Sequence, residues 1–270
     1  MSEWLKVIIL GVVEGITEFL PISSTGHLII TAALLDFRNS LGGTFEIFIQ
    51  LGAVLAVIFY YRRDLWQQAR QIPSDRNTQR FWLGIIIAVI PAGLLGFPMR
   101  GWITENLFTP SIVAISLILG GVIFLLTELR PPPAEEVTTE EVTLITLRQA
   151  IIIGIAQTIA LIPGISRSGA SIIGGMQAGL NRKTATQFSF YLAIPTLGGA
   201  TVIELLTSLD EINGDQLLML LLGMVVSAIV AWLSIGWLLR YVSNNTFVIF
   251  GYYRIMVGIL ILLLVAAQVL

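Results

Sequence analysis

The octapeptide LPISSTGH, residues 20–27, interrupts an apolar stretch that covers roughly residues 4–35. A second break, PGISRSGAS at residues 163–171, interrupts the apolar stretch over roughly residues 145–180. Broken backbone at membrane depth is tolerated only where it is buried in protein or lines a water-filled cavity. Each half-stretch is also too short to cross a bilayer alone. Both stretches are therefore predicted to be re-entrant helical hairpins whose tips meet inside the protein.

The composition indicates a membrane protein. Of the 270 residues, 56% are hydrophobic and 12% are charged, whereas a soluble domain carries about 25% charge. These values exclude a soluble enzyme and a disordered chain. The net charge is −2 without a basic block, which excludes nucleic acid as a partner. The absence of cysteine excludes disulfides and thiolate metal sites.

Six further segments have about the length and apolar character that a bilayer crossing needs. They cover residues 44–61, 81–99, 110–129, 186–206, 217–239 and 247–268. The predicted fold is thus an all-α integral membrane protein of about six transmembrane helices plus two re-entrant hairpins. Arginines gather in the 62–80 loop and near residues 130–148 and 240–246. Because positive residues stay in the cytoplasm, these loops are expected inside and both termini outside.

The two broken stretches align with each other at one constant offset. Residues 11–14 (GVVE) match residues 154–157 (GIAQ), and residues 23–26 (SSTG) match residues 166–169 (SRSG). Three spans follow each break, and an odd number of spans turns the second half upside down. The chain is therefore predicted to be one membrane domain, 1–270, with inverted repeats at 1–130 and 145–270 and a cytoplasmic linker at 131–144.

Carboxylates in the first stretch are the first candidates for chemistry. Glu14 and Glu18 lie four residues apart, so they share a helix face, and ionisable residues at this depth are functional by default. Together they can hold a hard divalent cation; without a metal, one of them becomes a proton donor. The alternative is that backbone amides satisfy both. Glu46 and Gln50 are also four residues apart; a supporting role at the site and a structural hydrogen-bond role are equally expected for them. Gln157 is a further supporting candidate, because it aligns with Glu14.

His27 is the only histidine in the chain. It follows Ser24 by three residues, where a helix is expected to restart with Ser23 or Ser24 as its N-cap. That spacing lets the imidazole reach the Ser24 hydroxyl and act as a base. The alternative is a buried, hydrogen-bonded imidazole with no catalytic role.

Arg167 lies at the second break between Ser166 and Ser168. A helix N-terminus attracts anions, and a guanidinium adds a fork that fits phosphate oxygens. The alternative is an arginine that neutralises Glu14 or Glu18 across the pseudo-twofold axis. Together the breaks supply an anion clamp, a nucleophile, a base and carboxylates for a metal, which suits phosphoryl transfer.

At these positions the sequence resembles the bacterial undecaprenyl-diphosphate phosphatases of the bacitracin-resistance type. The resemblance rests on GVVEGITEFLPISSTGHL (11–28), PGISRSGAS (163–171), TFEIFIQLGAVLAV (44–57) and QFSFYLAIPTLGGA (187–200). The family's Glu/Gln-x-x-x-Glu pattern matches Glu14 and Glu18, and its Ser-Ser-Thr-Gly-His pattern matches residues 23–27. Its Pro-Gly-x-Ser-Arg-Ser-x-x-Thr pattern matches residues 163–171, with Ser171 in place of the final threonine.

The resemblance implies an enzyme that hydrolyses undecaprenyl diphosphate to the monophosphate carrier lipid reused in peptidoglycan synthesis. It implies a multi-pass protein of the bacterial inner membrane that needs a divalent cation, Mg²⁺ or Ca²⁺, and has its site open to the outer, periplasmic side. The lipid bilayer and a polyprenyl diphosphate are the expected partners, and bacitracin is expected to compete for that substrate.

A mechanism follows as a hypothesis. The phosphates are held by serines and a threonine of the breaks together with Arg167; these residues are Ser23, Thr25, Ser166, Ser168 and Ser171. Ser24 or a water attacks with His27 as base, while Glu14 and Glu18 bind the cation or govern proton transfer. Inverted repeats with broken helices also occur in transporters, so a transporter or flippase of a lipid phosphate is the main alternative. A structural scaffold ranks last, because it leaves Glu14, Glu18 and Arg167 unexplained.

Overall fold

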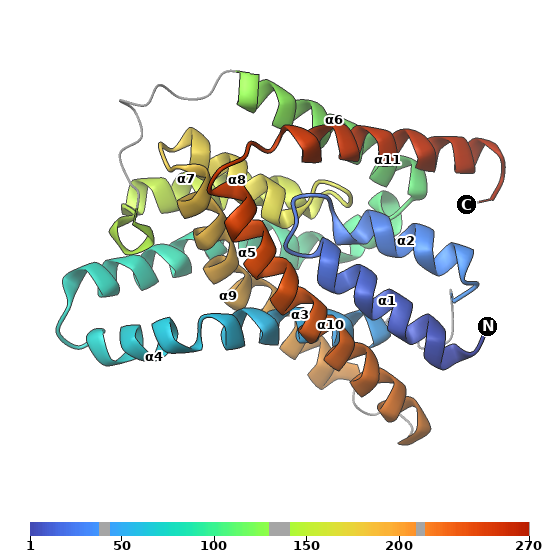
Figure 1. Ribbon diagram of the computed structural model, residues 1–270, viewed down its shortest axis with the longest axis horizontal. Helices are drawn as coiled ribbons and strands as arrows, with labels where there is room; N and C mark the ends of the chain where they lie inside the picture. The colour runs from blue at the N-terminus through green and yellow to red at the C-terminus, as the bar shows by residue number, and fades with distance from the viewer. Residues whose placement is uncertain (38–43, 130–140, 209–213, 270) are drawn as a thin grey trace.

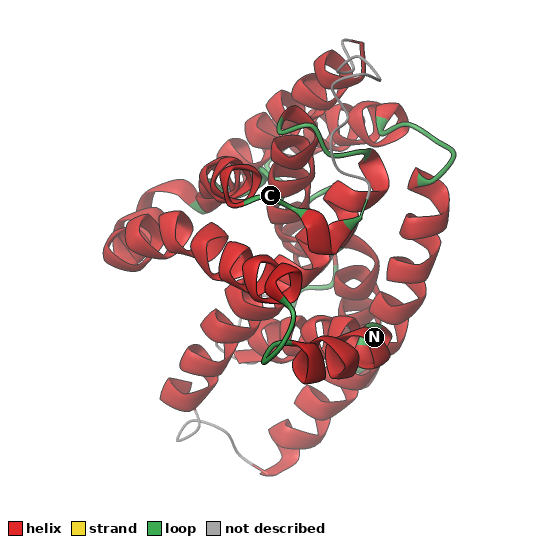
Figure 2. Cartoon of the chain, turned by 90° about the vertical axis from the view of Figure 1, so that its left-hand side faces the viewer, coloured by secondary structure: helices red, strands yellow, loops and turns green. Residues whose placement is uncertain are grey.

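The computed structural model describes residues 1–37, 44–129, 141–208 and 214–269, apart from the side chains of residues 204–216. All regular structure in these ranges is helical (Figures 1 and 2). The α-helices are α1 (Glu3–Thr17), α2 (Ser24–Leu34), α3 (Thr44–Tyr60), α4 (Arg62–Gln71), α5 (Arg76–Leu107), α6 (Pro110–Leu129), α7 (Leu147–Thr158), α8 (Arg167–Gln177), α9 (Arg182–Ser208), α10 (Gly214–Val242) and α11 (Val248–Ala266). Two short 3₁₀ helices are η2 (Val142–Leu144) and η3 (Ile159–Leu161).

Four helices in the described ranges are long and apolar enough to cross a bilayer: α5, α6, α10 and α11. A fifth is obtained if α3 and α4, which are bent by 66° at their junction, form one broken span. Large apolar side chains point outward from these helices; Phe97 is 82% exposed and Leu94 69%. Such a surface is stable only against lipid, so the chain is a multi-pass membrane protein.

The predicted span at 186–206 differs from the others. It lies within the continuous helix α9, but α9 is not among the helices that are apolar enough to count as a span. Residues 188–193 are all at most 1% exposed, so this part of α9 is covered by protein on every side. A helix packed in this way can carry serine and threonine residues, because their hydroxyls find partners in neighbouring helices or in their own backbone.

Both broken stretches fold as two short helices that pack on each other. The first consists of α1 and α2, and the second of α7 and α8, with η3 between them. Ser23 and Ser166, the residues that precede α2 and α8, have φ angles of 70° and 71°. A positive φ is unusual for a residue with a side chain. The two breaks therefore share one strained backbone turn, at positions that the sequence alignment makes equivalent.

Close helix contacts hold the hairpins in place. α1 packs along α10 and α7 packs along α5, while α6 runs beside α11 (Figure 1). Gly15 faces α10 so closely that a Cβ there would lie 2.7 Å from the carbonyl oxygen of Ser227. The α1–α10 and α7–α5 pairs are equivalent if the two halves repeat. The inverted repeat itself stays a prediction, and most of the predicted linker, residues 131–140, lies outside the described residues.

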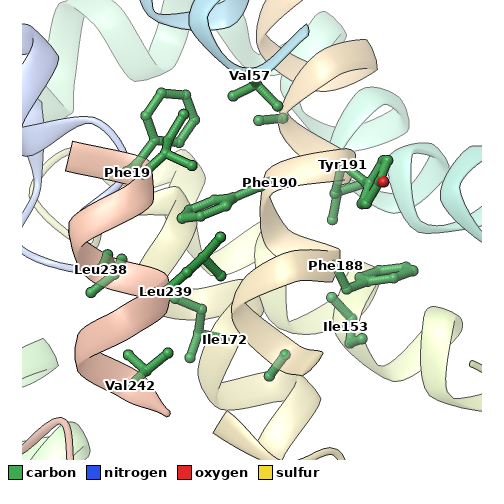
Figure 3. Packing of buried hydrophobic residues seen from close by; sticks show 14 of the residues in the cluster. Phe19, Val57, Ile153, Ile172, Phe188, Phe190, Tyr191, Leu238, Leu239 and Val242 are labelled. Carbon is green, nitrogen blue, oxygen red and sulfur yellow. The ribbon is translucent and has the colours of Figure 1, made fainter. Parts of the chain in front are cut away.

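Helix α9 forms the centre of the core (Figure 3). Its Phe190 points toward Phe19 and Leu238, whereas Phe188 and Tyr191 point to the other side of the helix. All five residues belong to one buried cluster. Since Phe19 precedes the first break and α9 runs beside α8, this core fixes both breaks relative to each other.

The two chain termini lie at one end of the long axis of the molecule, and the turn between α4 and α5 lies at the other end (Figure 1). This arrangement agrees with a placement of the arginine-rich 62–80 segment on the opposite side of the membrane from the termini. Which of these ends faces the cytoplasm stays a prediction.

Candidate active site

The tips of the two hairpins meet, as the sequence predicts. The Ser168 hydroxyl donates a hydrogen bond of 3.1 Å to the backbone carbonyl of Leu20. Arg167 Nη2, from the second break, lies 3.2 Å from Glu18 Oε1, from the first. Their side chains are only 12% and 5% exposed. An ion pair of this kind, largely removed from solvent, ties the two halves of the chain together.

Glu18 is the centre of this meeting point. Its second oxygen, Oε2, accepts a hydrogen bond of 2.6 Å from the Ser24 hydroxyl. Both carboxylate oxygens are therefore occupied, one by a hydroxyl of its own hairpin and one by a guanidinium of the other hairpin. A carboxylate at this distance from a hydroxyl is within reach to accept its proton.

Arg167 is the first residue of α8. Besides Glu18, it reaches α9, where Nη1 donates a hydrogen bond of 2.8 Å to the carbonyl of Ser189. Its Nε is buried and has no hydrogen-bond partner among the residues that the structure describes. The guanidinium thus neutralises Glu18, as the alternative interpretation expects, and still keeps one donor for a further ligand. The two interpretations of Arg167 are compatible.

The serines of the second break have protein partners. Ser166 Oγ accepts a hydrogen bond of 3.2 Å from Gly169 N–H, which caps α8, and lies 3.1 Å from Ser168 Oγ. Ser168 and Ser171 are fully buried. Ser171 Oγ lies 2.7 Å from Ser189 Oγ. These contacts give Ser168 and Ser171 a packing role, and their predicted contact with phosphate stays a prediction.

His27 makes different contacts from those expected. Its Nδ1 lies 2.8 Å from the carbonyl of Ser23 and its Nε2 lies 2.8 Å from the hydroxyl of Tyr253. A carbonyl only accepts, so Nδ1 carries a proton and donates to it. In the neutral imidazole, Nε2 then accepts the hydrogen bond of the Tyr253 hydroxyl. The predicted hydrogen bond between His27 and Ser24 is wrong, because the Ser24 hydroxyl donates to the stronger acceptor, the Glu18 carboxylate. A role of His27 in catalysis stays a prediction.

The other residues predicted for the site differ in burial and in their partners. Glu14 and Gln157 are each 2% exposed, and one side-chain oxygen of each, Glu14 Oε2 and Gln157 Oε1, is buried without a partner. Gln50 accepts a hydrogen bond of 3.3 Å from Thr201, which is a structural role. Glu46 lies exposed in the first turn of α3. Thr25, beside Ser24, is half-buried at the start of α2.

The carboxylates fit a divalent cation that also binds substrate. Glu14 has a free, buried oxygen, and an unpaired oxygen of this kind calls for a cation or a proton. No three acidic or histidine side chains converge on one point within the described ranges. Mg²⁺ is commonly held by one or two carboxylates together with substrate phosphates and water. Glu14 and Glu18 fit that set, since each Glu18 oxygen keeps a lone pair besides the one that accepts its hydrogen bond.

Arg254 has a role at the two breaks that its place within an apolar span did not reveal. It is fully buried in α11, and its guanidinium donates hydrogen bonds to carbonyls of both breaks: Pro21 at 3.1 Å, Gly164 at 3.1 Å and Ile165 at 2.9 Å. A single side chain therefore satisfies backbone groups that both breaks leave without helical partners. The available signal was an arginine in the middle of an apolar span, where a charged residue is expensive.

Known proteins match this chain over nearly its whole length, including the residues of the site. The family model described as Bacitracin resistance protein BacA matches residues 7–260, which include both breaks and Arg254. An undecaprenyl-diphosphatase of Deinococcus radiodurans is 49% identical over 99% of this chain and 97% of the relative. An undecaprenyl-diphosphatase of Albidiferax ferrireducens is 48% identical over 96% of this chain and 94% of the relative.

Proposed function

Since the chain belongs to the Bacitracin resistance protein BacA family and dephosphorylates undecaprenyl diphosphate, we propose that the meeting point of its two breaks is where this hydrolysis occurs. The products are undecaprenyl phosphate, the carrier lipid, and inorganic phosphate. One observation carries the assignment: Glu18 binds the hydroxyl of Ser24 with one oxygen and the guanidinium of Arg167 with the other. A nucleophile and an anion-binding group thus meet at one carboxylate, which can itself accept a proton.

The diphosphate binds at the start of α8. Arg167 offers its fork there, including the Nε that has no partner. The first backbone N–H groups of a helix lack intrahelical acceptors and attract anions, and Ser166 takes up only the N–H of Gly169. Ser23, Ser24 and Thr25 of the first break line the opposite side. The apolar tail stays in the bilayer.

In the chemical step, Ser24 Oγ attacks the terminal phosphorus while its proton passes to Glu18, 2.6 Å away. The new O–P bond replaces the anhydride bond, and undecaprenyl phosphate leaves with the electron pair of that bond. Water then attacks the phosphoserine, which releases inorganic phosphate and restores the Ser24 hydroxyl. A water that Glu18 activates directly is the alternative nucleophile, and it forms no phosphoserine.

His27 serves as a positioning residue in this scheme. Its ring fixes the Ser23 carbonyl through Nδ1 and is itself held by Tyr253 through Nε2. The Ser23 backbone sits at the strained turn that directs Ser24 toward Glu18. Glu14 and Glu18 would hold a divalent cation, which would supply positive charge beside the phosphates.

The site faces the outer, periplasmic side of the inner membrane, opposite the arginine-rich 62–80 segment. Two arguments support this orientation: the positive-inside rule and the position of both termini at the other end of the molecule from the α4–α5 turn. A diphosphate headgroup on that side is also within reach of bacitracin, which competes for the same lipid.

The proposal is tested by phosphate release from undecaprenyl diphosphate in detergent, with and without Mg²⁺ or Ca²⁺. We expect Arg167→Ala to lose at least a hundredfold in kcat/KM, because charge-assisted hydrogen bonds to phosphate are worth about 1.5–3 kcal/mol each. Arg240→Ala, at an exposed position near the end of α10, is the matched control and keeps wild-type activity. Equal activity of both variants would place the phosphate site elsewhere. Lipid transport without any phosphate release would favour the transporter alternative.

A further inference from the structure

A polar cavity lies outside the meeting point of the breaks. It has a volume of about 550 Å³ and is lined by α4, the start of α5, η2 and the second and third turns of α9. None of the residues that line it belongs to either break. The phosphatase site described above therefore does not account for it.

The cavity wall carries acids without bases. Asp64, Asp75 and Glu141 line it, and no lysine, arginine or histidine does within the described residues. Hydrogen bonds from Thr78 hold the pKa of the Asp75 carboxyl below its usual value, so Asp75 is ionised at neutral pH. The Asp75 and Glu141 carboxylates already accept hydrogen bonds from Thr78 and Thr143. Asp64 alone retains a carboxylate with no hydrogen bond or ion pair in the described chain.

Two buried polar atoms in the same wall also have no partner. They are the hydroxyl oxygen of Tyr61 and the side-chain carbonyl oxygen of Gln68, and their residues are only 3% and 6% exposed. The Gln68 amide nitrogen donates a hydrogen bond of 3.2 Å to the Tyr191 hydroxyl, which fixes the amide and leaves its carbonyl free. Buried polar groups are almost always paired, so these atoms call for a ligand that hydrogen-bonds to them.

The chemistry of the wall selects the ligand. The Gln68 carbonyl and the carboxylate of Asp64, which is exposed to solvent, both accept hydrogen bonds. A ligand that pairs with both of them donates hydrogen bonds and carries positive charge. A dehydrated metal ion lacks its ligand set, because no three acidic side chains converge within the described ranges. The rings of Tyr61 and Tyr191, whose centroids lie 4.6 Å apart, pack on each other in the same wall and add apolar surface for an alkyl chain. We propose that this cavity binds a small organic cation with several N–H donors, of the alkyl diamine class.

The proposed site is separate from the phosphatase site although both contact α9. Gln187 and Tyr191 line the cavity from one face of α9. Ser189 lies between them in sequence, and at 100° per residue its side chain leaves the opposite face. There its hydroxyl contacts Arg167 Nη1 at 3.4 Å and the Ser171 hydroxyl at 2.7 Å. Helix α9 is thus a wall between the two sites, and occupation of the cavity does not require the lipid substrate.

Binding of 1,4-diaminobutane to the purified, detergent-solubilised chain tests the proposal, by isothermal titration calorimetry at fixed ionic strength and without lipid substrate. We expect saturable binding of one diamine per chain. Asp64→Asn, which removes one charge, is expected to weaken binding at least tenfold. Tyr61→Phe, which removes one hydroxyl, is expected to weaken it at least threefold. Glu105→Gln removes the same charge at the other end of α5 and is expected to leave binding unchanged.

The outcomes separate the alternatives. The Asn and Phe replacements are nearly isosteric, and phosphate release at the wild-type rate by each variant shows that it is folded. The proposal is overturned if no saturable binding occurs, if Glu105→Gln weakens binding as much as Asp64→Asn, or if the uncharged analogue 1,4-butanediol binds equally well. Stoichiometric binding of Mg²⁺ alone, lost in Asp64→Asn, would identify a metal site and also overturn it.

Discussion

Arg167 Nη2 lies 3.2 Å from Glu18 Oε1, although the two residues are 149 positions apart in the chain. The contact joins a cation from the second break to an acid from the first, and both side chains are nearly excluded from solvent. Each break alone would leave an unpaired charge in an apolar environment, which is strongly unfavourable. The two halves therefore depend on each other for a stable site.

The shape of the Arg167 side chain should matter as well as its charge. Arg167→Lys keeps a cation next to Glu18 but loses the fork that also reaches the Ser189 carbonyl. We expect kcat/KM for undecaprenyl diphosphate to fall about 10- to 100-fold, which corresponds to one or two lost charge-assisted bonds. Near-normal kinetics of this variant would show that the fork is unnecessary.

Ser24 is expected to carry the phosphoryl group. Ser24→Ala removes the hydroxyl that donates to Glu18, and we expect phosphate release to fall more than about 1,000-fold. Rapid quenching with substrate labelled in the terminal phosphate should leave covalent label on the wild-type chain and none on the variant. Absence of label on an active wild-type enzyme, with less than a tenfold loss in Ser24→Ala, would identify water as the nucleophile.

Tyr253 is expected to act through His27. Tyr253→Phe removes the hydroxyl that bonds to His27 Nε2 without changing the parallel ring contact at 5.6 Å. We expect kcat to fall roughly 3- to 10-fold, as for the loss of one hydrogen bond of about 1 kcal/mol, with little change in KM. Its neighbour Tyr252 is 64% exposed, so Tyr252→Phe is the control. An equal effect of both substitutions would argue against this positioning role.

Arg254 is expected to govern stability and activity together. Arg254→Met removes the donors for carbonyls in both breaks, and each carbonyl left buried and unpaired costs about 1–3 kcal/mol. The thermal unfolding midpoint should fall by several degrees and activity should be lost. Arg240→Met is the control, because Arg240 is exposed and bonds only to a carbonyl of its own helix. An unchanged midpoint in Arg254→Met would contradict the clamp.

Two glycines should differ in how their replacement by alanine changes the free energy of unfolding. A Cβ at Gly15 would lie 2.7 Å from the Ser227 carbonyl oxygen in α10, so Gly15→Ala should destabilise the chain by about 1–3 kcal/mol. A Cβ at Gly93 has no atom within 4 Å, so Gly93→Ala should be neutral or stabilising by up to about 1 kcal/mol. Thermal unfolding in one detergent compares them directly; destabilisation by both would mean that α1–α10 packing is not the cause.

The orientation is accessible to single-cysteine labelling, because the chain has no cysteine of its own. Ser2 and Arg70 are both exposed and lie on predicted opposite sides. In intact cells with a permeable outer layer, an impermeant maleimide should label Ser2→Cys, and should label Arg70→Cys only after the inner membrane is disrupted. The reverse pattern would place the active site on the cytoplasmic side.

The local pattern of the sequence was sufficient to predict the helical hairpins and their meeting. Pro, Ser and Gly clusters inside apolar runs mark broken helices wherever they occur, and a buried Arg167 needs an acid nearby. The hydrogen bonds within the site were beyond the sequence. His27 bonds to Tyr253 across 226 residues, and Arg254 reaches both breaks from α11; such contacts depend on how distant helices pack.

Competition between acceptors explains the one wrong contact. Helical spacing allowed the imidazole of His27 to reach the hydroxyl of Ser24, but spacing does not rank acceptors. The turn at residues 18–23 brings the Glu18 carboxylate back to the start of α2, and a carboxylate accepts a hydroxyl proton more strongly than an imidazole does. Segment 186–206 was predicted to be an ordinary membrane span. A helix that is surrounded by protein shows no periodic pattern that distinguishes it from a helix surrounded by lipid.

The most direct measurement is phosphate release from undecaprenyl diphosphate by Glu18→Gln, beside Glu105→Gln as the control for loss of one carboxylate. Glutamine keeps the size of the Glu18 side chain but cannot take the Ser24 proton or neutralise Arg167. The role of Glu18 as general base predicts a loss of about 100- to 10,000-fold in kcat for Glu18→Gln, and none for the control. Glu18→Gln that folds normally and releases phosphate at the wild-type rate would contradict it.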